Sequence, residues 1–186
     1  MLAGASVGAL ILTQIYWVRG FLRMSSTGLS AQAKGSPNNT LESAKVLWQT
    51  VVVKSALETL HRLNSHASST PATDGKQVFV TFLKVGGRKV PAPNVSTPRL
   101  ITPGTILVAA YDMEGEKKWS VEIGDFISAH GFNACPVLYK DLVIINGDHD
   151  GKSYLAALDR DTGKVRWRVA RKHDIRSYVT PIIRKI

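Results

Sequence analysis

The sequence is poor in cysteine, with Cys135 as the single one among 186 residues. One thiol excludes an intrachain disulfide and any metal centre built from several cysteines. The chain also lacks the glycine-rich loop ending in Gly-Lys-Ser/Thr that cradles phosphate. No pair of carboxylates can be assigned as a general acid and base from the sequence alone. None of these features points to an enzyme.

Acidic residues are in the minority, at 14 against 24 lysines and arginines, which gives a net charge of +10. The basic residues are scattered, with a modest cluster at residues 171–176. Without a nucleic-acid-binding motif, such a charge favours solubility or an anionic neighbour such as phospholipid. We therefore expect no nucleic acid partner.

The N-terminus carries an uncharged stretch from Leu2 to Val18, followed by Arg19 and Arg23. Its 17 residues reach the lower limit for spanning a bilayer. We predict a hydrophobic helix in residues 1–24, acting as an export signal or a membrane anchor at the cell envelope. The alternative is an upstream extension, with Met24 as the natural start. Residues 25–45 form a Ser- and Gly-rich segment typical of a linker.

The clearest signal is an internal repeat, because "YDMEGEKKW" (111–119) is matched by "LDRDTGKVRW" (158–167). In each copy an Asp opens a tight turn, a Gly supplies the positive φ, and a Trp follows four residues after the Gly. Apolar segments with paired alanines precede both turns, so each copy predicts a strand, a turn and a strand. The repeated residues are Asp112, Gly115, Trp119, Asp159, Gly163 and Trp167.

A second repeated element sets the length of the unit. "STPATDGKQVFVTF" aligns with "ACPVLYKDLVIING", and "VTPIIRKI" begins a third copy. Pro136 and Pro181 stand 45 residues apart, which suits one four-stranded propeller blade. Pro71 and Pro136 stand 65 apart, and the Pro- and Gly-rich residues 83–104 account for the excess. We interpret 83–104 as an insertion between the first two strands of the first complete blade.

These patterns predict an all-β chain, with an incomplete β-propeller in residues 46–186: about two four-stranded antiparallel blades and part of a third. The strands expected in the second blade are Pro136–Tyr139, Leu142–Asn146, Ser153–Leu158 and Val165–Ala170. A single blade is apolar on both faces, so blades must stack, and we expect the Trp of the last strand to pack between them. Two blades cannot close a ring of four to eight, so the sequence is expected to be a fragment of a longer propeller.

The repeats "AALDRDTGKVRW" and "AAYDMEGEKKW" resemble the pyrroloquinoline-quinone-type (PQQ-like) β-propeller repeat family. The copy "AAYDMEGEKKW" departs from the pattern by having Glu in place of Thr. The neighbouring segments resemble a bacterial group similar to the lipoprotein subunit of the outer-membrane β-barrel assembly machine. The resemblance implies a non-catalytic binding or scaffold module of the cell envelope. The alternative is part of a quinoprotein-like oxidoreductase whose catalytic residues lie beyond Ile186.

A scaffold of this kind implies a protein or envelope-polymer partner, bound through the loops Phe126–Ala134 and Arg171–Tyr178, and a membrane contact through the N-terminal segment. The calcium site and aromatic platform that pyrroloquinoline quinone needs in true quinoprotein dehydrogenases are not matched, so we expect no cofactor.

One constellation could hold a metal, since His66 and His130 fall at similar points before their blades, and Asp148 and His149 lie on a loop. The alternative is that these side chains bond loop backbone. "NGDHDGKS" (146–153) begins like a calcium loop but lacks the distal Glu, and its Asp-Gly pair favours a hairpin.

Overall fold

A computed structural model describes residues 48–184. Of these, residues 52–184 belong to one compact unit. The described residues contain strands and no helix, so the predicted all-β class is confirmed. The strands are β1 (Ala72–Thr73), β2 (Gln77–Val85), β3 (Val90–Pro91), β4 (Leu100–Ile101), β5 (Gly104–Asp112), β6 (Lys117–Phe126), β7 (Val137–Tyr139), β8 (Leu142–Gly147), β9 (Tyr154–Asp159) and β10 (Val165–Ala170).

The strands form two four-stranded antiparallel sheets, ordered β1-β2-β5-β6 and β7-β8-β9-β10. We name them sheet 1 and sheet 2. All four strands predicted for the second unit are present, with ends that differ by at most one residue. The stretch 146–153 makes the predicted hairpin, because β8 and β9 pair up to Gly147 and Tyr154. Short connections favour the antiparallel order throughout sheet 2.

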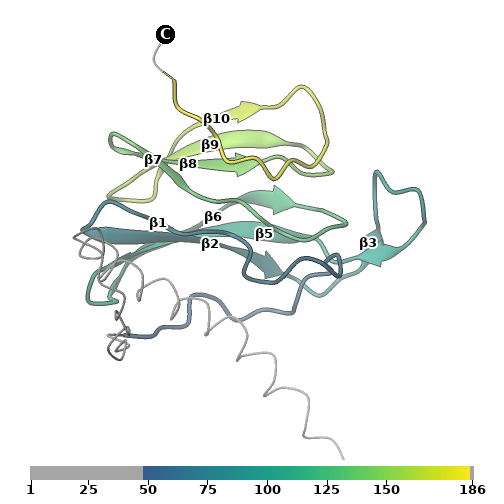
Figure 1. Ribbon diagram of the computed structural model, residues 1–186, viewed down its shortest axis with the longest axis horizontal. Helices are drawn as coiled ribbons and strands as arrows, with labels where there is room; N and C mark the ends of the chain where they lie inside the picture. The colour runs from purple at the N-terminus through teal and green to yellow at the C-terminus, as the bar shows by residue number, and fades with distance from the viewer. Residues whose placement is uncertain (1–47, 185–186) are drawn as a thin grey trace, which may run out of the picture. The chain divides into compact units, whose positions relative to one another are not determined.

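The insertion lies elsewhere than the sequence suggested. It separates β2 from β5, which are the second and third strands of sheet 1, and not the first two. These two strands pair without interruption from Gln77 opposite Asp112 to Val85 opposite Gly104. Part of the predicted insertion therefore lengthens the sheet, and the remainder carries the small β3–β4 ladder, which projects from one end of the sheets (Figure 1).

The two sheets stack face to face, as the ribbon shows (Figure 1). Their facing side chains form one buried apolar cluster. Sheet 1 contributes Phe79, Leu83, Val85, Ile106, Val108, Ala110, Trp119, Ile123 and Phe126, and sheet 2 contributes Val143, Ile145, Tyr154, Ala156 and Leu158. The far face of sheet 1 is also covered, since Val78, Val80 and Phe82 are buried. Burial of both faces explains why β2 is buried without interruption from Val78 to Leu83 and shows no polar–apolar alternation there.

Both repeated turns have the predicted chemistry. The Asp112 carboxylate accepts the N–H groups of Glu114 and Glu116 at 3.1 and 2.8 Å, and the Asp159 carboxylate accepts the N–H of Thr162 at 2.9 Å. Gly115 and Gly163 both have positive φ, at 91° and 71°. A residue with a side chain would be strained at either position.

The predicted packing of the repeated Trp holds for Trp119. Its Nε1–H donates to the carbonyl of Arg160 at 2.9 Å, and its ring lies under Gly163 of the next unit. A Cβ on Gly163 would come within 2.6 Å of the indole, so this turn needs glycine for space as well as for conformation. Trp167 stands at the equivalent place on sheet 2 and is 37% exposed, with no unit stacked on it in residues 48–184.

A second contact also repeats from one unit to the next. The Thr81 hydroxyl on β2 donates to the carbonyl of Ala134, two residues before Pro136. The Asn146 amide on β8 donates to the carbonyl of Val179, two residues before Pro181. Equivalent residues therefore hold the chain where it enters the next unit.

The predicted helix in residues 1–24 and the linker in residues 25–45 lie outside the described residues. Across residues 48–184 there is no helix with the length and hydropathy needed to cross a membrane.

Candidate binding site

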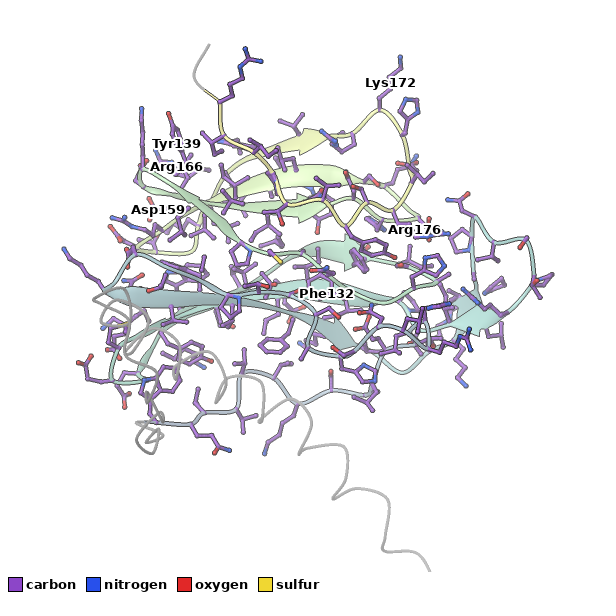
Figure 2. The ribbon with its side chains drawn as sticks, viewed as in Figure 1. Phe132, Tyr139, Asp159, Arg166, Lys172 and Arg176 are labelled. Atoms are coloured by element: carbon purple, nitrogen blue, oxygen red, sulfur yellow. The ribbon has the colours of Figure 1, made fainter. Side chains whose placement is uncertain are left out.

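Two chain segments meet at one end of the stacked sheets. One is the connection from β6 to β7, and the other is the C-terminal segment after β10. The hydroxyls of Ser128 and Tyr178 are hydrogen-bonded at 2.9 Å, and Arg176 Nε donates to His130 Nδ1 at 3.1 Å. These are the two loops that the sequence predicted as a contact surface, and the structure brings them together. Most of residues 126–134 are buried, so the exposed part of this surface comes mainly from the C-terminal segment. Figure 2 shows Lys172 and Arg176 at the opposite end of sheet 2 from Asp159 and Arg166.

An ion pair fixes the C-terminal segment at this end. Arg176 Nη1 donates to both carboxylate oxygens of Asp150, at 2.8 and 2.7 Å. The Asp150 side chain is fully buried and that of Arg176 is 18% exposed. Asn94 of the insertion donates to the same carboxylate at 3.1 Å, and its carbonyl accepts from Arg176 at 3.2 Å. One buried carboxylate thus joins the insertion, the β8–β9 hairpin and the C-terminal segment.

A pocket of about 380 Å³ opens beside these loops. The Asn64 amide donates to the His130 carbonyl at 2.8 Å, and the His61 ring stands edge-on to the His130 ring at 5.6 Å. Burial is the main cause that lowers the pKa of His130, with smaller effects from nearby cations, Arg176 first among them. The ring is therefore neutral near pH 7, which agrees with its Nδ1 accepting a bond from Arg176. The lining residues are His61, Leu63, Asn64, His130, Asn133 and Tyr178.

The lining decides what the pocket can do. It consists of imidazole, amide and phenol groups with one aliphatic side chain. Such groups suit a partner side chain or polymer unit that exchanges neutral hydrogen bonds and covers an apolar patch. The pocket therefore fits recognition of a neutral group.

A buried carboxyl group lies close to the same loop. Glu58 accepts a hydrogen bond from the backbone of Phe132, and burial raises the pKa of Glu58 to about 7. His66 Nδ1 is 3.9 Å from the Glu58 carboxyl, and burial lowers the pKa of His66. Because burial favours the neutral form of both groups, they do not form an ion pair at neutral pH.

The residues predicted as metal ligands are distributed over separate contacts. His66 lies beside Glu58, His130 accepts from Arg176, and Asp148 pairs with Arg171 at 3.0 Å. Within the described range 48–184, no group of three or more His, Cys, Asp or Glu side chains could hold a metal ion. The metal site stays a prediction.

His149 has a structural environment. The residue is 3% exposed, and its ring lies 5.5 Å from the Phe126 ring. Its Nδ1 accepts the N–H groups of Ile127 and Gly151, both at 3.1 Å, and its Nε2 lies 3.2 Å from the carbonyl of Lys152. This is the backbone-bonding role that the sequence left open as the alternative.

Sequence reasoning missed several members of the site. No motif singled out His61, and Asn64 carries no recognisable signal. Arg176 stood in the basic cluster 171–176, but its partner Asp150 was assigned only to a hairpin. The signal that could have found this pair was the presence of a cation, Arg176, in one predicted loop and a carboxylate, Asp150, in another.

Comparison with protein-family models and with curated proteins gave no match. The resemblance to the PQQ-like repeat therefore rests on the residues quoted above.

Proposed function

We propose that this chain is a non-catalytic binding or scaffold module of the β-propeller kind, acting in the bacterial cell envelope. The observation that carries the proposal is the joining of loops 126–134 and 171–178 at one end of the sheets, through Ser128–Tyr178 and His130–Arg176. The exposed C-terminal segment is held against the mostly buried loop 126–134 beside a pocket, which suits a contact surface, since preorganisation reduces the entropic cost of binding.

The propeller arrangement is supported by contacts that recur with the repeat. Trp119 packs on the Gly163 turn of the following unit, and the bond from Thr81 to Ala134 recurs as the bond from Asn146 to Val179. Trp167 occupies the place on sheet 2 where a third unit of the same kind would pack. The resemblance to the PQQ-like repeat agrees with this arrangement, and the apolar segment from Leu2 to Val18 supports the envelope location.

Site-specific photo-crosslinking in the bacterial host tests the proposal. A crosslinking amino acid is placed at Lys172, on the exposed part of the C-terminal loop, and as a control at Asp161, whose side chain is 70% exposed. Asp161 belongs to the β9–β10 turn, at the Asp159 end of sheet 2. We expect one envelope protein or polymer to be captured reproducibly from position 172 and not from position 161.

Two results would contradict the proposal. One is equal capture from both positions, which indicates non-specific contact. The other is dye reduction by the purified full chain after addition of pyrroloquinoline quinone and calcium, which indicates an oxidoreductase.

A further inference from the structure

A second and larger cavity is lined by residues of both sheets, and it shares Phe126 and Ile127 with the loop 126–134. Its volume is about 790 Å³, within the range of small-molecule sites. One wall comes from the end of β6 and the start of the insertion, and the other from the β8–β9 hairpin and from β10. Apolar lining from Val85, Val90, Pro103, Phe126 and Ile127 accompanies several charged groups.

The guanidinium of Arg168 is held rigidly in the cavity wall. Its Cζ lies 3.6 Å from the centroid of the Tyr154 ring, and its Nη1 donates to the Ile123 carbonyl at 3.1 Å. Gly124, with φ of +146°, makes room for it, since a Cβ there would lie 2.8 Å from both terminal nitrogens. Stacking, one backbone bond and a missing side chain thus fix the group, while most of its five donors remain available.

The charges of the lining leave two cations without an ion-pair partner among the described residues. Lys84 pairs with Glu122, and Lys152 pairs with an Asp outside the lining. Arg88 and Arg168 also line the cavity, and neither has a carboxylate partner in the part of the chain that the structure describes. An oxyanion is the ligand that a fixed guanidinium recognises best, because it accepts two parallel hydrogen bonds.

The cavity lining also contains a negatively charged group, the carboxylate of Asp125. This carboxylate has no ion pair among residues 48–184. Arg168 and Asp125 both line the cavity and do not pair with each other. A ligand that lies between them needs a hydrogen-bond donor for Asp125 as well as an anion for Arg168.

We propose that this cavity binds a hydroxylated organic acid of sugar size. Its carboxylate or phosphate lies against Arg168 and Arg88, and a hydroxyl donates to Asp125. The volume is far larger than a bare anion needs, and the apolar lining accommodates the carbon skeleton.

Isothermal titration calorimetry of the full chain at low ionic strength tests this site. The probes are D-gluconate, D-glucose 6-phosphate, inorganic phosphate and D-glucose. We expect saturable binding of gluconate or glucose 6-phosphate, and the better of the two tells a carboxylate from a phosphate ligand. Inorganic phosphate and glucose are expected to bind more weakly, because phosphate supplies the anion without the sugar hydroxyls and glucose supplies the hydroxyls without the anion.

Variants on β10 provide the matched comparison. Arg168→Gln is expected to weaken binding at least about tenfold, because charge-assisted hydrogen bonds are lost. Arg166→Gln removes the same charge from the same strand, at a side chain that pairs with Asp159 at 2.9 Å outside the cavity, and is expected to leave binding unchanged. Arg168→Lys keeps the charge without the planar fork and is expected to bind with intermediate affinity.

Circular dichroism confirms that each variant is folded. Absence of saturable binding of both gluconate and glucose 6-phosphate overturns the proposal. Equal affinity of the Arg168→Gln and Arg166→Gln variants also overturns it, as does phosphate or glucose binding as tightly as the sugar acids.

Discussion

Replacing Glu58 by Gln tests the link between the buried carboxyl group and stability. The Glu58 side chain is 7% exposed, and its carboxyl accepts a backbone hydrogen bond from Phe132. A Gln side chain has nearly the same shape and keeps an oxygen for that bond, but it cannot ionise. The substitution therefore isolates the cost of the buried charge.

The magnitude follows from the pKa of Glu58, which burial raises from 4.5 to about 7. The native state holds this proton more tightly than the unfolded state does, so stability falls as the pH rises between these two values. The full cost well above pH 7 is about 3 kcal/mol. Protonation of His66 does not offset it near neutral pH, because burial lowers the pKa of that ring.

Urea denaturation from pH 4.5 to pH 8.5 measures the effect. We expect the Glu58→Gln variant to match the wild type near pH 4.5 and to exceed it by about 3 kcal/mol above pH 8. Glu114→Gln, at an exposed carboxylate, is the control and is expected to show no such trend. A constant difference across the range, or one that is largest at low pH, would refute the reasoning.

Two further substitutions test the packing. Gly163→Ala should destabilise the fold by more than about 2 kcal/mol, since it adds backbone strain and a clash with Trp119. Gly75→Ala is the control, because it adds the same kind of strain with no atom within 4 Å of the new Cβ. Urea denaturation compares the two variants, and equal losses of stability would show that the indole contact is absent. Asp150→Asn should cost about 3 kcal/mol in the same assay by leaving Arg176 uncompensated, and a loss below about 1 kcal/mol would show that the ion pair behaves as a surface pair.

Local chemistry made much of the fold predictable. The Asp and Gly of each turn act through nearby backbone, so the turns and the β9–β10 hairpin could be placed from the sequence. The position of the insertion could not, because β2 is apolar on both faces and gives no period from which to count strands. Pairing of Val85 with Gly104 depends on the ladder between two strands far apart in the sequence.

The candidate site was predictable as a region and not as a set of contacts. The sequence predicted 126–134 and 171–178 as a contact surface, but most of 126–134 is buried in the structure. The partnership of Arg176 with Asp150 depends on how the sheets stack. The histidines show the same limit. His130 and His149 resemble ligands in the sequence, yet each accepts a hydrogen bond in the structure, from Arg176 and from backbone N–H groups respectively.

Indole hydrogen exchange tests most directly whether the two sheets stack through the repeated tryptophan. In a ¹⁵N-tryptophan-labelled protein, assigned with Trp119→Phe and Trp167→Phe variants, the account predicts a slowly exchanging Nε1–H at Trp119. That proton is bonded to the Arg160 carbonyl, whereas the Trp167 indole, at 37% exposure, should exchange fast. Equal exchange rates at the two positions, or greater protection at Trp167, would contradict the stacking.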